Sequence, residues 1–477
     1  MRKGVFYFLA TGLLIWGAIS FWGKSTPPEV RRAEIDAIRP TARFSDDVCN
    51  PKIDTRSAPY FLGGVQIKEE DQVQWVKELI HSGMNTVEVT VYAQQGRWFD
   101  NNLWFEDISE NTLKEIRTAK AAGMKVVLIL RMRIDHAFPE NKFLWHGMIY
   151  PETEYLLNRW FENYSRFARM YAKMAEREDV DVFVIGSEMN AVFASRPVSR
   201  VPDLEQHLLS KKAQNDYLRK MLRLGKTRLT SNYLSSPGEP NYTDLETYLR
   251  DKSECHRNWA SKVACVDSKD QVACMNRRRA IHYSYWNKLI WGLKDIYHGK
   301  LTVAANFDNY DQIVFWPDLD MVGINAYFPL RTLESDSIPV KEQMVEGWKR
   351  EFKKVLHYLD TLGVPNMPVL ITELGYTRYS GSTIAPWKGH GFSLLETAET
   401  DSLIIWDQQP IDLAERNAAI EALKEAVRET NFPLAGILYW KFTSMEEQVK
   451  EDPFALQIGT ASEDKLPGLL KDVLMEN

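Results

Sequence analysis

Short apolar runs alternate along the chain with segments in which apolar residues recur at helical spacing. Eight such runs, rich in β-branched residues, cover residues 61–67, 86–92, 125–131, 180–188, 301–306, 319–327, 367–373 and 435–442. Strands that are buried on both faces of a parallel sheet have this continuous apolar pattern. Because no glycine-rich phosphate-binding fingerprint follows the first run, the pattern favours an α/β fold of the closed (β/α)8 TIM-barrel type over an open doubly wound sheet.

The segments between the runs have the periodicity of amphipathic helices. In DQVQWVKELIHSG, at residues 71–83, the apolar side chains of Val73, Val76, Leu79 and Ile80 recur at helical intervals, and a glycine ends the segment. This spacing predicts a helix with one face on the core, followed by a turn at the glycine.

The connection between the fourth and fifth runs is longer than one crossover requires. It covers roughly residues 191–300, whereas connections in compact α/β domains are usually short. We predict a long insertion here, a disulfide-bearing subdomain at residues 195–280, with the helical part after it completing the barrel. The barrel as a whole is expected over residues 57–465, with a C-terminal tail at 466–477.

The N-terminus has the pattern of an export signal. Arg2 and Lys3 precede an apolar run over residues 5–22, and a basic start before an apolar run is typical of such signals. The run is longer than most signal-peptide cores and near the lower limit for a membrane span. Residues 1–23 are therefore expected to be a cleaved signal peptide or a membrane anchor, and residues 24–56 a linker. The protein is expected to be exported, either periplasmic or extracellular, or tethered to the membrane.

Composition narrows the class of partner. Of the 477 residues, 44% are apolar and 26% are charged, and the formal net charge is only −6. This mild charge argues against nucleic acid as a partner. The 15 tryptophans and 20 tyrosines fit either a large core or a cleft in which sugar rings stack on aromatic side chains.

Four cysteines are present: Cys49, Cys255, Cys265 and Cys274. Disulfides persist in exported proteins, and four cysteines allow three pairings, between which the sequence does not decide. The spacing contains no C-x-x-C pair, so no metal site is expected. The sequence also gives no sign of a cofactor.

Two of the apolar runs end on a glutamate. Glu188 ends the fourth run and Glu373 ends the seventh, and the carboxyl ends of barrel strands carry the active-site loops. Glycoside cleavage uses two carboxyl groups, one protonated and one ionised. We therefore predict that Glu188 is the acid/base, that Glu373 is the nucleophile, and that the substrate is a polysaccharide or oligosaccharide.

Other side chains near the same face are candidates for substrate binding. The polar candidates are Arg131, Ser187, Asn190, Asn306, Asn325 and Tyr327, and Trp440 is a stacking floor for a sugar. Arg131 fits a structural ion pair equally well, and Asn306 fits simple turn chemistry. Glu88, inside the second run, must be paired or point into the barrel mouth. Trp98, Trp104 and Trp145, on the loops after the second and third runs, are further candidates for sugar subsites.

Three motifs resemble a known clan of enzymes. IGSEMN, ITELGY and the tryptophan of ILYWKF are similar to the motifs of the large barrel clan of retaining glycoside hydrolases, which carry the acid/base and the nucleophile on strands four and seven. Pro386-Trp387 and the later EDPFALQIG most resemble glycoside hydrolase family 113, whose known members include β-1,4-mannanases. The resemblance covers roughly residues 60–460. It implies retention of configuration, a β-mannan-type substrate and a substrate-binding role for Trp387.

One position departs from the clan pattern. Many clan members have an asparagine directly before the acid/base glutamate, where this chain has Ser187. A smaller residue fits a different contact to a sugar with an axial 2-hydroxyl, but it also fits a weakened enzyme. A non-catalytic carbohydrate-binding or cell-envelope protein on a glycosidase scaffold is therefore the alternative. A transglycosylase would use the same two glutamates.

Overall fold

The computed structural model describes residues 58–194, 245–263, 265, 268–331, 340–384, 386–387, 393–396, 402–405, 410–460 and 462–475. The expected signal or anchor at 1–23, the expected linker at 24–56 and the first part of the expected insertion lie outside these residues. No helix within the described ranges is both long and apolar enough to cross a membrane.

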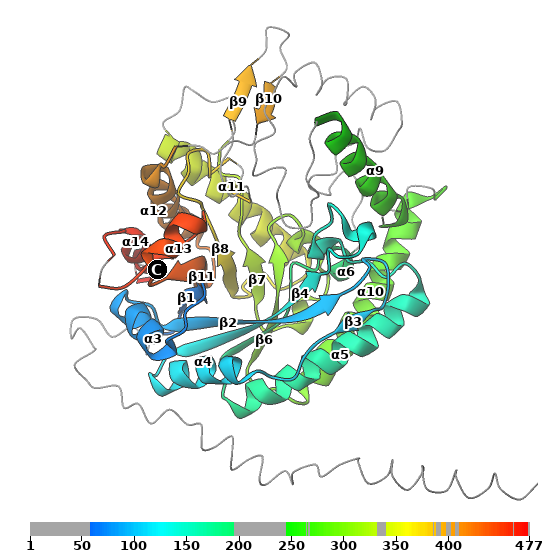
Figure 1. Cartoon of the computed structure of the whole chain (residues 1–477), viewed down its shortest axis with the longest axis horizontal. Coiled ribbons are helices and arrows are strands. Elements are labelled where there is room, and N and C mark those ends of the chain that lie inside the picture. Colours follow the sequence, from blue (N-terminus) through cyan, green and yellow to red (C-terminus); the bar gives the residue numbers. More distant parts are fainter. Residues whose placement is uncertain are drawn as a thin grey trace, which may run out of the picture. The chain divides into compact units, whose positions relative to one another are not determined.

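Eight parallel strands close into a barrel, as the apolar runs predict (Figure 1). They are β1 (Phe61–Gln66), β2 (Thr86–Gln95), β4 (Lys125–Ile134), β5 (Val182–Ser187), β6 (Lys300–Asn306), β7 (Val322–Asn325), β8 (Val369–Leu374) and β11 (Leu434–Thr443). Each strand pairs with its neighbours along the chain, and β1 closes the ring by pairing with both β2 and β11. The fold is therefore a (β/α)8 barrel.

The side chains of the strands alternate between two cores. Val127, Ile129 and Val184 belong to a small apolar cluster that fills the barrel interior. Val87 and Val126, on the opposite face of their strands, belong to the larger core between strands and helices. Because a parallel barrel buries both faces of its strands, the runs read as continuously apolar.

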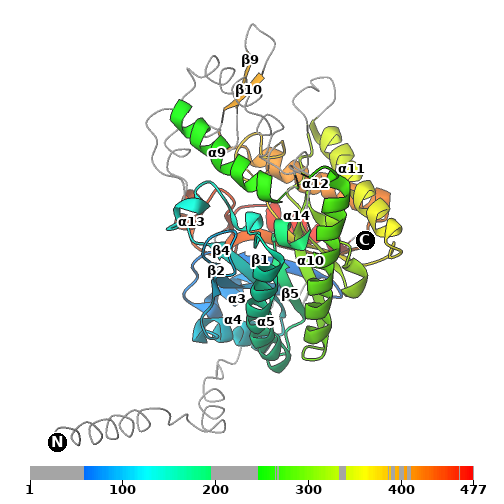
Figure 2. The ribbon, with the colours of Figure 1, turned by 90° about the vertical axis from the view of Figure 1, so that its right-hand side faces the viewer.

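Helices form the outer layer of the barrel. The main ones are α3 (Gln72–His81), α4 (Glu110–Ala121), α5 (Glu154–Arg177), α10 (Gln271–Lys294), α11 (Val340–Thr361), α12 (Leu413–Thr430) and α14 (Leu466–Met475). Asp71 caps α3 by accepting hydrogen bonds from the backbone N–H groups of Val73 and Gln74, which satisfies two of the free donors of the first turn. In Figures 1 and 2, α11 and α12 lie side by side on one flank and α5 and α10 on another.

Short elements complete the described structure. They are β3 (Leu103–Trp104), β9 (Ser393–Glu396), β10 (Ser402–Ile405), β12 (Leu456–Gln457), α6 (Asn190–Phe193), α13 (Glu446–Glu451), and the 3-10 helices Pro139–Asn141, His146–Met148, Tyr310–Gln312 and Trp316–Asp318. Residues 466–475, expected to be a tail, form α14 and pack on α12.

The later part of the long connection consists of α9 (Leu245–Val263) and α10. A disulfide joins Cys265, which follows α9, to Cys274 in the first turn of α10. The Cys255 thiol of α9 is free and donates a hydrogen bond to the Lys142 carbonyl (2.7 Å). Cys49 lies outside the described residues. In α10, Trp286 is fully buried and packs edge-on against Phe161 of α5 (5.4 Å between ring centroids). The helix α10 therefore completes the outer layer of the barrel.

Candidate active site

Glu373 lies on β8 with three hydrogen-bond donors directed at its carboxyl group. Asn325 Nδ2 donates to Oε1 (2.8 Å), Tyr327 OH donates to Oε2 (2.7 Å), and Arg131 Nη2 also donates to Oε1. These donors come from β7, from the residues just after it, and from β4, so the barrel mouth brings them together. The Glu373 side chain is only 3% exposed. This donor set suits a buried carboxylate.

Opposing influences act on the Glu373 carboxyl group. Burial holds its pKa above the ordinary value of a glutamate, and the negative charge of Glu188 adds to this. The Arg131 charge and the hydrogen bond from Tyr327 lower the pKa of Glu373, against the effects of burial and of Glu188. Protonation of Glu373 is therefore sensitive to the charge carried by Glu188, so the two carboxyl groups titrate as a pair.

Glu188 follows the last residue of β5 and adopts a left-handed backbone conformation, with φ of +51°. Such a φ is uncommon for a residue with a side chain, and it is held by a backbone hydrogen bond from Glu188 N to the Ala304 carbonyl (2.9 Å). Glu188 Oε2 lies 3.1 Å from His146 Nε2, and the side chain is 14% exposed. The backbone thus turns the carboxyl group out of the strand direction at the mouth of the barrel.

The groups around Glu188 also shift the pKa of its carboxyl group in opposite directions. Burial raises the pKa of its carboxyl group, but the His146 contact, the Arg131 charge and Asn325 together hold the pKa below its ordinary value. Among the described residues, Glu188 interacts with two side chains, His146 and Asn325, whereas Glu373 accepts hydrogen bonds from three. The carboxyl group with fewer protein contacts is the freer of the two to exchange a proton with a bound molecule.

Arg131 and Asn325 connect the predicted residues to one another. The Arg131 guanidinium lies 4.5 Å from the ring centroid of Trp440, so the ion pair with Glu373 is stacked on the β11 tryptophan. Asn325 Nδ2 is 3.4 Å from Ser187 Oγ, and its Oδ1 accepts a hydrogen bond from Thr372 Oγ1 (2.8 Å). The Thr372 bond fixes the orientation in which the Asn325 amide donates to Glu373.

Three predicted binding residues lie apart from this network. Asn190 begins α6, and its carbonyl accepts a hydrogen bond from Asn309 Nδ2 (3.4 Å). Asn306 Oδ1 accepts from the Phe307 N–H (3.0 Å), which is the turn chemistry considered as the alternative. Trp387 is 38% exposed and stacks on Phe307, with ring centroids 5.3 Å apart. This exposed pair offers an apolar face to solvent.

The three loop tryptophans expected at sugar subsites differ in their surroundings. Trp98 is 2% exposed and lies in the core, whereas Trp104 is 42% exposed. Trp145 packs edge-on against His146 (5.0 Å between centroids). His146 contacts Glu188, and the sequence does not predict this contact because His146 precedes Glu188 by 42 residues and lies in a loop without a motif. The described residues contain no group of three or more His, Cys, Asp and Glu side chains that could hold a metal ion.

Comparison with solved structures supports the barrel assignment. A β-mannanase of family 113 from Alicyclobacillus acidocaldarius, in complex with ManMIm, is similar over 88% of this chain and 100% of its own, with a TM-score of 0.53 and 15% identity. A second family 113 structure, a β-1,4-mannanase complex, gives a TM-score of 0.52 at 15% identity over 88% of this chain and 99% of its own. At this identity the likeness shows the fold.

The family is shown by the sequence. No curated protein matches the chain. The model of Glycoside Hydrolase Family 113, however, matches residues 64–196 and 243–403, which is more than half of the chain. The matched ranges contain both Glu188 and Glu373, with Ser187 and the donors to Glu373. The chain belongs to glycoside hydrolase family 113 and is a glycoside hydrolase that acts on a carbohydrate.

Proposed function

We propose that the protein is a retaining β-glycosidase that cleaves a polysaccharide, with β-1,4-mannan as the first candidate, by double displacement. Glu373 is the nucleophile and Glu188 the acid/base. The observation that carries this assignment is the difference between the two donor sets: Arg131 and Tyr327 donate hydrogen bonds to Glu373 and not to Glu188. These hydrogen bonds lower the pKa of Glu373 against the burial and the Glu188 charge that raise it, and so favour the ionised form that a nucleophile needs.

In the first step, a Glu373 carboxylate oxygen attacks the anomeric carbon while the bond from that carbon to the glycosidic oxygen breaks. Glu188 donates its proton to the departing oxygen, which leaves as a hydroxyl group. In the second step, the Glu188 carboxylate takes a proton from water, the water oxygen attacks the anomeric carbon, and Glu373 leaves as a carboxylate. Two inversions give net retention.

Glu188 must hold a proton in the first step, although its pKa is low in the empty site. The cause lies largely in His146 and Arg131, which oppose the effect of burial. A sugar bound at Glu188 excludes water from the carboxyl group, which raises its pKa. Its assignment as the acid therefore depends on occupancy of the cleft.

Two observations favour β-mannan as the substrate: the activity for which the similar structures are described, and the short side chain of Ser187. The similar structures are described as β-mannanases. The Ser187 side chain is short and fully buried beside Asn325. A short residue leaves space for the axial 2-hydroxyl of mannose, where a longer asparagine side chain would reach further into the cleft.

Trapping and rescue experiments distinguish the two roles. A 2-deoxy-2-fluoro mannosyl fluoride should label Glu373, which peptide mass spectrometry would locate. Glu188→Ala should retain turnover of an aryl mannoside with a good leaving group, and azide should accelerate it to a β-mannosyl azide. Azide rescue of Glu373→Ala should instead give the α-azide. The assignment would be reversed if the label were found on Glu188, or if Glu188→Ala gave the α-azide and Glu373→Ala the β-azide. Glycan binding without turnover would favour a non-catalytic binding protein.

A further inference from the structure

Glu88 is a buried acid without a hydrogen-bond partner. It lies on β2 and is 1% exposed, and neither of its carboxyl oxygens accepts a hydrogen bond within the described parts of the chain. The nearest charged group is Arg131, whose Nη2 is 3.8 Å from Glu88 Oε1. This distance exceeds that of a hydrogen bond, and Arg131 already donates to Glu373.

A buried carboxyl group without a hydrogen-bond partner destabilises the folded protein. A buried polar atom with no partner loses its hydration without compensation. Burial raises the pKa of Glu88 well above its ordinary value; Arg131 lowers it in part, while Glu373 and Glu115 add to the increase. The raised pKa favours the protonated form of Glu88 relative to an exposed glutamate, and a protonated carboxyl group can donate one hydrogen bond and accept others.

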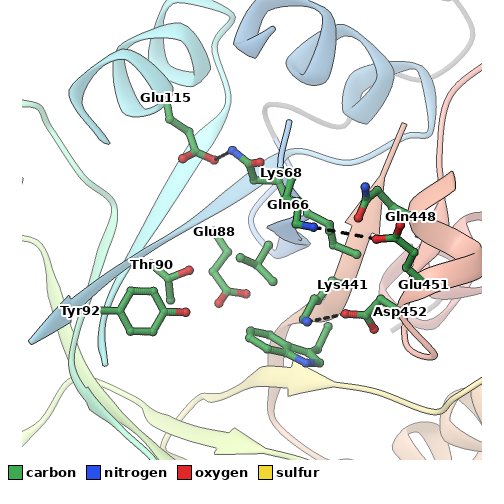
Figure 3. A pocket seen from close by; sticks show the side chains of 13 residues that line it. Gln66, Lys68, Glu88, Thr90, Tyr92, Glu115, Lys441, Gln448, Glu451 and Asp452 are labelled. Carbon is green, nitrogen blue, oxygen red and sulfur yellow. Dashed lines mark hydrogen bonds and ion pairs between the residues drawn. The ribbon is translucent and has the colours of Figure 1, made fainter. Parts of the chain in front are cut away.

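Glu88 lines a cavity of about 560 Å³ between β1, β2 and β11, a size that accommodates small ligands. Figure 3 shows Glu88 in the middle of the lining residues, between Thr90 of its own strand and the Lys441–Asp452 pair. Trp440 also lines the cavity, and Arg131 links this tryptophan to Glu373. Two residues that line the cavity, Glu88 and Trp440, therefore lie next to Arg131, which donates to the proposed nucleophile.

The other charged groups of the cavity have protein partners. Lys441 Nζ is 2.6 Å from Asp452, and Lys68 Nζ is 3.9 Å from Glu451. Glu115 Oε1 accepts a hydrogen bond from Gln66 Nε2 (3.2 Å). Glu88 therefore differs from Glu115 and Asp452, which accept hydrogen bonds, in that neither of its buried carboxyl oxygens accepts one from the described residues.

We infer that this cavity is a subsite for a neutral sugar unit on the nucleophile side of the cleft, and that Glu88 determines specificity there by hydrogen bonding to a sugar hydroxyl. The inference rests on the proposed function. Trp440 supplies an aromatic face, and Thr90 and Tyr92 follow Glu88 on the same face of β2.

The test measures oligosaccharide binding separately from turnover. Calorimetry in the Glu373→Gln background would use β-1,4-mannotriose and β-1,4-glucotriose, with and without Glu88→Leu or Glu88→Gln. We expect Glu88→Leu to weaken binding of the preferred trisaccharide by about 10- to 100-fold, and Glu88→Gln to weaken it less. The Tm of Glu88→Leu should equal or exceed that of the parent, because the variant removes two unsatisfied atoms. Glu351→Gln is the matched control: Glu351 is also buried, but it is paired with Lys354 (3.0 Å) on α11.

Several outcomes would overturn the subsite. Unchanged affinity in both Glu88 variants would do so, as would absence of binding by either trisaccharide. A lowered Tm with unchanged affinity would make Glu88 structural. A fall in kcat of the otherwise wild-type enzyme, with unchanged trisaccharide affinity, would mean that Glu88 acts only through Arg131 on Glu373. Failure of the proposed function is distinguishable: Glu88-dependent binding without hydrolysis by the wild type would keep the subsite and reject the glycosidase.

Discussion

Replacement of Tyr327 by phenylalanine tests whether Glu373 carries the catalytic negative charge. The Tyr327 hydroxyl donates to Glu373 Oε2 at 2.7 Å in a buried site. Burial and the neighbouring Glu373 raise the Tyr327 pKa well above its ordinary value, so the hydroxyl remains a donor throughout the working range. Phenylalanine keeps the ring, which packs edge-on against Phe454 (6.0 Å between centroids). The variant thus removes one hydrogen bond with little change in packing.

A hydrogen bond to a charged group contributes about 1.5–3 kcal/mol, so kcat/KM should fall by about 10- to 150-fold. Because the lost donor lowers the pKa of Glu373, the acid limb of the kcat/KM profile should move to higher pH. The assay is release of reducing ends from mannan between pH 3 and 9. Tyr376→Phe is the control, since that hydroxyl donates to the Phe328 carbonyl (3.2 Å) and not to a carboxyl group. An unchanged rate and acid limb in Tyr327→Phe would refute the assignment of the charge to Glu373.

Three further predictions concern protonation. His146→Phe removes a contact that lowers the Glu188 pKa, so the alkaline limb of kcat/KM should move to higher pH; a shift to lower pH would contradict this. Burial, aided by the Arg278 charge, lowers the pKa of His282 to about 3. The unfolded chain takes up that proton first as pH falls below about 6.5, so this histidine should remove about 2 kcal/mol of stability between pH 7 and 5. Urea unfolding at pH 7 and at pH 5 should show that His282→Leu loses less stability between these two pH values than the wild type does. Hydrogen bonds from Thr383 and Gly381, with the Arg331 charge, hold the Glu415 pKa low against burial. The stability from this carboxylate is present above its unfolded pKa and lost as pH falls through its folded value; Glu415→Gln should therefore lower Tm at pH 7 but not at pH 3.

The barrel and its two glutamates could be predicted from the sequence because both follow from strand patterns. A strand buried on both faces has to be apolar throughout, so a glutamate at its end marks the barrel mouth, as for Glu188 and Glu373. Asn325 and Tyr327 could be placed for the same reason, since Asn325 ends β7, Tyr327 closely follows it, and β7 is adjacent to β8.

Residues on long loops could not be placed in this way. His146 reaches Glu188 from the connection after β4, whose path depends on packing that no periodicity encodes. Trp98 is a loop residue by sequence, but its backbone N–H donates to Asn141 Oδ1 (2.9 Å) and its ring is buried. The Glu88 cavity is lined by residues of β1, β2 and β11 together, which is a property of the closed barrel and not of one strand.

Whether the protein is a glycosidase with Glu373 as its nucleophile is tested most directly by measuring the release of reducing ends from β-mannan, glucomannan, β-glucan, xylan and galactan. The wild type is compared with Glu373→Gln, and Glu351→Gln is the folded control. We predict that the wild type and Glu351→Gln release reducing ends from a β-linked polymer, with β-mannan as the first candidate, and that Glu373→Gln loses this activity by orders of magnitude while keeping its Tm. Turnover that persists in Glu373→Gln, or a folded wild type that cleaves none of the polymers, would contradict the account.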